Sequence, residues 1–161
     1  MVAVEGVRDA FHRAVFADQD LAAALALAGP DFSLINLPAG TGAPTVDRLP
    51  AYLLDVFGNL PAGLTFRRIA RVVDRWRVAE EAVASFTHDR ELPWLLPGIP
   101  ATHCRAEVLV TSMVTVNRSQ VASYRSLWDQ TTLRSPQGSG YGQSTEGLVS
   151  WVGSGKAYQP L

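Results

Sequence analysis

The hydrophobic positions of the chain change their spacing from about 3.6 residues in the first third to two residues in the middle. Repeats of three and four residues are typical of a helix with one buried face. They predict a helix over residues 4–16, whose buried stripe would be Val4, Val7, Phe11, Ala14 and Val15. Arg8 and His12 then fall mostly on the solvent side, so His12 is interpreted as a surface histidine.

A second helix is predicted over the segment LAAALALA, residues 21–28. Asp18 could cap it, because a carboxylate accepts a free backbone N–H of the first turn. Gly29 and Pro30 would end it, and residues 32–37 read as a short strand. A third helix would follow Asp47 as its cap, with Pro50 tolerated in the first turn. Its buried stripe would be Leu49, Tyr52, Leu53, Val56 and Phe57.

From Gly63 onward the alternation of apolar and polar residues predicts strands over residues 64–78, 82–88, 103–116 and 121–132. Glu80 and Glu81 would make one turn, and residues 117–119 a hairpin turn. In the first of these strands one face would be apolar, carrying Phe66, Ala70, Val72 and Trp76. The opposite face would carry Arg67, Arg71, Arg75 and Arg77, as a solvated surface or a subunit contact.

Helices followed by a run of long antiparallel strands indicate an α+β fold. We expect a cone-shaped curved antiparallel sheet wrapped around the N-terminal helices, in one domain over residues 1–133. The Gly- and Ser-rich tail, residues 134–161, would pack on this barrel or on a partner subunit, or be disordered.

Composition narrows the class of protein. Of 161 residues, 47% are hydrophobic and 18% charged, as in an ordinary globular protein. The net charge of -1 gives no electrostatic reason to expect a nucleic acid or an anionic membrane as partner. A single cysteine excludes an internal disulfide. The N-terminus lacks the pattern of a signal peptide and no apolar run is long enough to span a membrane, so a cytoplasmic protein is expected.

The connection over residues 86–102, FTHDRELPWLLPGIPAT, is unusually apolar for a loop. We expect it to roof a small-molecule pocket. Four ionisable residues lie near the ends of the strands around it: His88, Asp89, His103 and Asp129. Because side chains alternate along a strand, only one of His88 and Asp89 can face the pocket, and the apolar neighbours of His88 favour His88.

A carboxylate in an apolar cavity has a raised pKa, which suits a group that takes and returns a proton. Asp129 is therefore the candidate general base and acid, and His88 could polarise a carbonyl or protonate an enolate. Two plainer interpretations stay open. Asp129 could pair with Arg125 or cap a turn, and His88 could be a core histidine. The spacing of the His and Asp residues contains no metal-ligand pattern, and no metal or cofactor is expected.

The segment THDRELPWLLPGIPAT, followed by a long strand, a hairpin and SLWDQTTL, resembles the SnoaL-like polyketide cyclases of the nuclear-transport-factor-2-like superfamily. The matching motifs are Thr87-His88, the GIPAT of residues 98–102, and Trp128-Asp129, and the resemblance covers residues 5–133. It implies a cone-shaped α+β barrel, a homodimer, no cofactor, and Asp129 as acid/base for an intramolecular aldol closure, with His88 lining the pocket. The chain departs from the pattern at Asp89 and His103.

These observations predict a cofactor-independent cyclase of secondary metabolism, such as antibiotic biosynthesis, that closes a ring in a hydrophobic polyketide-like substrate. The expected substrate-binding residues are Tyr52, Trp76, Asp89, Trp94, Leu96, Ile99, His103 and Trp128. The alternatives are a pericyclic cyclase acting by preorganisation, an isomerase, dehydratase or epoxide hydrolase of the same fold, and a non-catalytic binding module. The volume of the pocket, and whether Asp129 and His88 face one another across it, would discriminate between them.

Overall fold

The computed structural model describes residues 3–130, which form three α-helices, a single 3-10 turn (Val46–Arg48) and a six-stranded sheet. The helices are α1 (Val4–Phe16), α2 (Leu21–Leu27) and α3 (Leu49–Gly58). The strands are β1 (Ala28–Leu37), β2 (Thr41–Ala43), β3 (Ala62–Val73), β4 (Arg77–Thr87), β5 (Arg105–Asn117) and β6 (Gln120–Trp128). The predicted tail lies outside the described residues.

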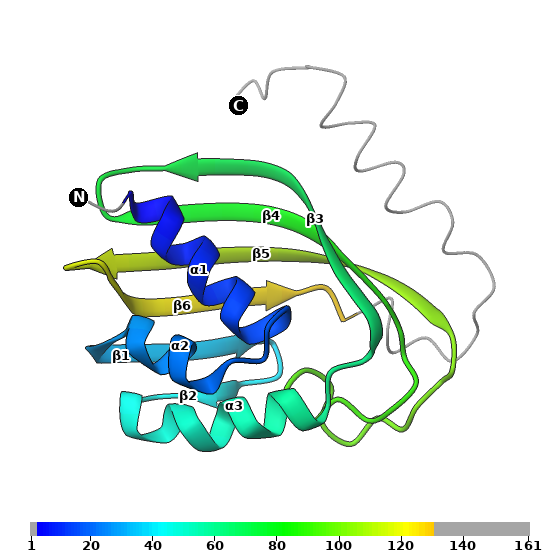
Figure 1. The fold of residues 1–161 in the computed structure, drawn as a ribbon. Coiled ribbons are helices and arrows are strands. Elements are labelled where there is room, and N and C mark those ends of the chain that lie inside the picture. Colours follow the sequence, from blue (N-terminus) through cyan, green and yellow to red (C-terminus); the bar gives the residue numbers. More distant parts are fainter. Residues whose placement is uncertain (1–2, 131–161) are drawn as a thin grey trace, which may run out of the picture.

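The sheet has the order β2-β1-β6-β5-β4-β3 and curves around the helices, which confirms the predicted α+β class. Figure 1 shows α1 lying across one face of the sheet and α3 beside the edge formed by β2. The sheet is mixed rather than antiparallel throughout, because β6 runs parallel to β1. This follows from the path of the chain, since the meander from β3 to β6 returns β6 alongside β1 in the same direction.

The first helix begins and ends as predicted, and its buried residues share one face toward the sheet. That face is wider than the apolar stripe, because it includes the side chain of Arg8 in addition to Val7, Phe11, Ala14 and Val15. Glu5 in the first turn and Arg13 in the last turn both lie where the helix dipole favours their charges.

The starts of the second and third helices differ from the prediction. Asp20, not Asp18, caps α2, accepting the backbone N–H of Ala23 at 2.9 Å. Gly29 and Pro30 already belong to β1. Asp47 does not cap α3, because it lies in a 3-10 turn that runs directly into the helix.

The predicted single strand over residues 64–78 is two strands, β3 and β4, joined by a turn at Asp74–Trp76. Asp74 stabilises this turn by accepting the backbone N–H groups of Trp76 and Arg77 at 2.7 Å each. Glu80 and Glu81 consequently lie inside β4 rather than in a turn.

A bulge in β3 changes which residues face the helices. Between the pairs Arg68–Ala82 and Ala70–Glu81 the register shifts, so Ile69 is an extra residue on β3. A one-residue insertion moves every later side chain to the other face. Arg71 therefore turns inward beside Glu80, whereas Val72 is 71% exposed, the reverse of the predicted faces.

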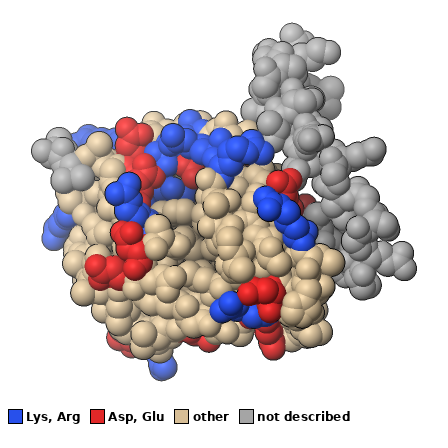
Figure 2. Space-filling model, turned by 45° about the vertical axis from the view of Figure 1, so that its right-hand side comes forward, with Lys and Arg blue, Asp and Glu red and all other residues tan. Residues whose placement is uncertain are grey.

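The charged surface shows no segregation by sign on the side drawn in Figure 2, where acidic and basic side chains are interleaved. This agrees with the near-zero net charge of the chain. None of the helices within residues 3–130 is long and apolar enough to cross a membrane.

Candidate functional site

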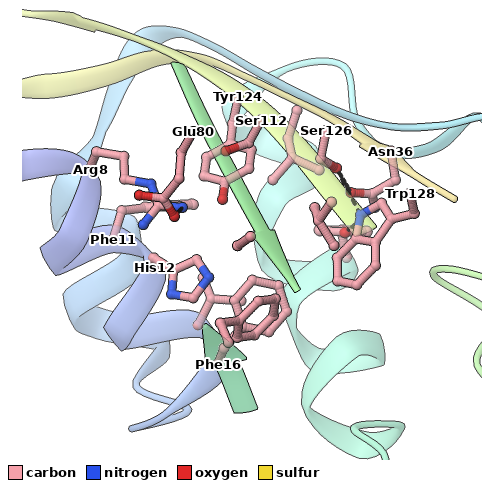
Figure 3. Close-up of a pocket in the computed structure, with 16 residues that line it drawn as sticks. Arg8, Phe11, His12, Phe16, Asn36, Glu80, Ser112, Tyr124, Ser126 and Trp128 are labelled. Carbon is pink, nitrogen blue, oxygen red and sulfur yellow. Dashed lines mark hydrogen bonds and ion pairs between the residues drawn. The ribbon is translucent and has the colours of Figure 1, made fainter. Parts of the chain in front are cut away.

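A narrow pocket lies between α1 and the inner face of the sheet, with α3 closing one side. It takes lining residues from α1, β1, α3, β3, β4, β5 and β6, and most of its walls are apolar or aromatic. Its volume is about 30 Å³, enough for a few water molecules, since one buried water needs about 10–15 Å³. Figure 3 shows polar side chains on opposite sides of this interior pocket.

One wall carries a buried ion pair. Arg8 of α1 contacts Glu80 of β4 at 2.8 Å, and both side chains are more than nine-tenths buried. The bulge in β3 adds Arg71, which bonds both Glu80 and Asp9. Because each charge has a partner, this wall brings no net charge to the pocket. The Nε of Arg8 is buried with no hydrogen-bond partner in the described part of the chain.

His12, interpreted from the sequence as a surface residue, lines the interior pocket one helical turn beyond Arg8. Its ring lies against Phe66 and Phe16, at centroid distances of 4.6 and 4.8 Å. Burial lowers the pKa of His12 to about 3, with a further contribution from the charge of Arg8. The imidazole is thus neutral at pH 7, available as a hydrogen-bonding group but poorly matched to serve as a general base.

The opposite wall carries a chain of hydrogen bonds. The indole Nε1 of Trp128 donates to Ser126 Oγ at 3.0 Å, and Ser126 donates to Asn36 Oδ1 at 2.8 Å. Asn36 Nδ2 donates to the hydroxyl of Tyr52 at 2.6 Å. Asn36 and Ser126 are brought together because they are register partners in the parallel pair β1–β6.

Aromatic rings form the wall between these two polar groups. Phe66 meets Trp128 edge-on at 6.1 Å, and Trp128 meets Trp94 edge-on at 5.5 Å. Phe16 touches both Phe66 and Trp94. We call Phe16, Phe66, Trp94 and Trp128 the aromatic cluster. Three members of the aromatic cluster, Phe16, Phe66 and Trp128, line the interior pocket.

The apolar loop over residues 86–102 does not roof the interior pocket as expected. Leu92, Leu95 and Leu96 are fully buried in the hydrophobic core, and Trp94 supports Trp128 from behind. None of the loop residues lines the pocket. The loop is apolar because it completes the core at the open end of the cone.

His88 is also a core residue. It is 1% exposed, its Nδ1 lies 3.1 Å from Thr102 Oγ1, and burial lowers its pKa. Its backbone bonds Cys104 and His103, tying the end of β4 to the chain before β5. His88 points inward, as its apolar neighbours in the sequence suggested, but it does not line the interior pocket.

Asp129 lies on the other side of the sheet from the interior pocket. Alternation along β6 was predicted correctly, with Tyr124, Ser126 and Trp128 on one face and Asp129 on the other. The inner face is that of Trp128. Asp129 lines a separate open groove of about 510 Å³, together with Pro38, Leu109, Thr111, Leu127, Trp128 and Gln130. We call this the outer groove.

The other predicted substrate-binding residues are likewise not brought together in one pocket. Tyr52 and Trp128 line the interior pocket. Trp76 is 51% exposed in the β3–β4 turn, and His103 lies exposed before β5 with a φ of 57°. Asp89 accepts the backbone N–H of Ala62 and pairs with Arg90, whose hydrogen bond helps lower its pKa to about 2. Leu96 and Ile99 pack in or against the core.

Sequence reasoning missed the polar residues that line the interior pocket: Arg8, His12, Asn36, Glu80, Ser112, Tyr124 and Ser126. A signal existed for some of them. Tyr124, Ser126 and Trp128 alternate on one face, and Arg8 and His12 are four residues apart on one helix face. No group of three His, Cys, Asp or Glu residues within residues 3–130 is close enough to hold a metal ion.

No protein-family model and no curated protein sequence matches the chain. Solved structures do match it in shape. An NTF2-like protein from Burkholderia thailandensis has a TM-score of 0.63 at 16% identity, covering 83% of this chain and 95% of its own. A protein described as a SnoaL-like polyketide cyclase from Jannaschia sp. has a TM-score of 0.63 at 15% identity, covering 83% and 92%.

An LEH-like epoxide hydrolase from M. tuberculosis is similar over a longer stretch, with a TM-score of 0.59, 16% identity, and coverage of 94% of this chain and 96% of its own. At such low identity the likeness establishes the fold and not the reaction. The chain therefore has the NTF2-like fold, which is the fold that the SnoaL-like resemblance implied.

Proposed function

We propose that this protein is a cofactor-independent cyclase that holds a compact, uncharged polyketide-like chain in a reactive shape inside the interior pocket. The observation that carries the proposal is the composition of the pocket walls. They are aromatic and hydrogen-bonding, the histidine among them, His12, is neutral with a low pKa, and the two charged residues, Arg8 and Glu80, pair with one another. Such walls favour catalysis by orientation over catalysis by a tuned carboxylate.

The aldol version of the reaction, with Asp129 as acid/base and His88 assisting, finds less support. Asp129 lines the outer groove, whereas His88 lines neither the interior pocket nor the outer groove. In that version the substrate would have to bind in the outer groove. The two versions therefore predict opposite effects of the same substitutions.

The test uses a panel of linear polyketone and polyene thioesters, with liquid chromatography and mass spectrometry to detect a product of equal mass or of that mass less one water. For any substrate converted, Asp129→Asn should keep turnover within about twofold of the parent. Phe66→Ala should lower it about tenfold or more, because a misplaced chain loses its reactive geometry. Circular dichroism checks that both variants fold. If Asp129→Asn lost turnover and Phe66→Ala kept it in full, the reaction would instead take place in the outer groove.

A non-catalytic binding module is the second candidate, and the small volume of the interior pocket favours it. About 30 Å³ is far below the roughly 300–1,000 Å³ typical of ligand sites. Under this candidate the panel would yield a bound ligand, seen as a thermal shift, without conversion. Detection of any cyclised product that depends on the interior pocket would exclude it.

We also propose a homodimer, formed through the outer face of the sheet. Ile35, Met113 and Leu127 are exposed there on three neighbouring strands, β1, β5 and β6. Clustered apolar side chains on an open sheet face are typical of a protein interface.

A further inference from the structure

The direction of the hydrogen bonds around Asn36 is fixed, because one end of the network is a group that can only donate and the other is a group that can only accept. The indole N–H of Trp128 can only donate, so the oxygen of Ser126 accepts from it. The backbone carbonyl of Trp94 can only accept, and Asn36 Nδ2 lies 3.3 Å from it. The atom of Asn36 that faces this carbonyl must therefore be the amide nitrogen, which leaves Oδ1 facing Ser126.

All hydrogens in this network are therefore donated in the same direction, from Trp128 toward Tyr52. Ser126 gives its hydroxyl hydrogen to Asn36 Oδ1 at 2.8 Å, and Asn36 gives an amide hydrogen to the Tyr52 oxygen at 2.6 Å. Tyr52 is thus an acceptor within the network, and its own O–H hydrogen is left over. No acceptor for that hydrogen is found among residues 3–130, although Tyr52 lines the interior pocket.

A donor at the end of such a chain is a strong one. Each hydrogen bond polarises the next, so the phenol that accepts from Asn36 becomes a better donor. Burial raises the pKa of Tyr52, so the hydroxyl keeps its proton throughout the neutral range. The free hydrogen of Tyr52 therefore persists wherever the protein is folded.

We propose that the Tyr52 hydroxyl, oriented by Asn36, Ser126 and Trp128, is the polar anchor of the interior pocket and binds the carbonyl or ether oxygen of an uncharged ligand. The ligand is uncharged because Arg8 and Glu80, the charged residues of the pocket wall, already neutralise one another. The remaining walls are largely apolar, which suits a hydrocarbon body attached to that oxygen. The inference deepens the proposed function, on which it rests, by naming the chemical class that the pocket takes.

Tyr52 is then a ligand-binding residue, and Asn36 and Ser126 are positioning residues that act through it. In the proposed cyclase, a hydrogen bond to a carbonyl withdraws electrons from the conjugated bond beside it and makes that bond more reactive toward ring closure. The same contact would hold a carbonyl ligand in a protein that performs no reaction.

The experiment uses two probes of matched shape, cyclopentanone carrying ¹³C at the carbonyl, and methylenecyclopentane, which has no acceptor. The full-length protein is titrated with each and followed by NMR. Wild type should bind the ketone about threefold to tenfold more tightly than the hydrocarbon, the effect of one net hydrogen bond. The carbonyl resonance should move downfield on binding.

Tyr52→Phe should remove both the preference and the downfield shift while still binding the hydrocarbon. Asn36→Asp should remove the shift with the phenol still present, because the carboxylate accepts the Tyr52 hydrogen and withdraws it from the pocket. Leu54→Ala is the control. Leu54 is 58% exposed on α3, the helix that carries Tyr52, and it lines neither the interior pocket nor the outer groove, so the ketone shift should persist.

Equal binding of the two probes by wild type would overturn the proposal, as would a carbonyl shift that survives Tyr52→Phe. Failure of both probes to bind would overturn it too, because the interior pocket would then admit no ring of this size. The proposed function fails separately. A wild-type protein that shows the ketone shift but cyclises no member of the thioester panel would support Tyr52 as the polar anchor and contradict the proposed cyclase activity.

Discussion

Among single residues, His12 shows how strongly burial at the interior pocket changes a pKa. Its pKa falls from an ordinary value of 6.5 to about 3 because burial penalises the charged imidazolium. Between these values the unfolded chain binds a proton at this position and the folded protein does not. The free energy of unfolding therefore rises with pH across this interval and is lost as the pH falls from 6.5 toward 3.

This linkage predicts a specific sensitivity to acid. Between pH 7 and pH 5, wild type should lose about 1–2 kcal/mol more of its free energy of unfolding than His12→Gln, which has no titrating group there. Urea unfolding at the two pH values measures the difference. The carboxylates affect both proteins alike, so an equal loss in both would mean that His12 is accessible to water in the folded state.

At the scale of elements, the bulge in β3 decides what the sheet presents to α1. Because Ile69 is an extra residue, Arg71 enters the interface and bonds Asp9 of α1 at 2.6 Å as well as Glu80. The buried carboxylate of Glu80 thereby has two arginine partners, Arg8 and Arg71. Removing one partner from a buried ion pair leaves charge uncompensated, which costs far more than the loss of a surface pair.

Arg71→Met should therefore lower the free energy of unfolding by about 2–4 kcal/mol. Arg77→Met provides the control, since Arg77 pairs with Asp74 at the exposed β3–β4 turn with a side chain that is 56% exposed. Its loss should stay within about 1 kcal/mol. Both values come from denaturant unfolding at pH 7. Similar small losses in the two variants would show that the Arg71 interactions contribute no more than a surface pair.

The same bulge explains why the orientation of side chains in β3 was predicted wrongly from the sequence. Period-two alternation identified β5, β6 and the hairpin at residues 117–119, and helical spacing identified α1 to the residue, whereas the turn between β3 and β4 and the short strand β2 were missed. Alternation carries no mark of one inserted residue, so the side chains of β3 after Ile69 were assigned to the wrong faces. Arg8 and His12 were placed in solvent because a polar residue on a helix gives no sign that a curved sheet covers it.

The site was predicted less well than the fold for a related reason. Local alternation placed Asp129 and Trp128 on opposite faces correctly, but which face is the inside depends on the curvature of the whole sheet. An isolated strand does not encode that choice. The hydrogen-bond chain from Trp128 to Tyr52 joins β6, β1 and α3, and its members meet only because β1 and β6 pair in parallel.

For the molecule as a whole, the outer face of the sheet predicts self-association. Ile35, Arg125 and Met113 are register partners across β1, β6 and β5, and Leu127, which is 54% exposed, lies in the next row beside Thr111. A carboxylate introduced at position 127 would lose its water if two copies packed against each other there, and this desolvation costs more than pairing with the nearby Arg125 returns.

Leu127→Asp should accordingly convert the protein from dimer to monomer at micromolar concentration, as measured by sedimentation velocity. Leu54→Asp is a matched control, because Leu54 is 58% exposed on α3, away from the sheet face, and this variant should sediment as wild type does. The outer groove adds a further expectation. Since Leu127 and Asp129 both line it, a dimer through this face would bring the two outer grooves close together and shield Asp129 from solvent. A wild-type protein that sediments as a monomer, or a Leu127→Asp variant that stays dimeric, would contradict this interface.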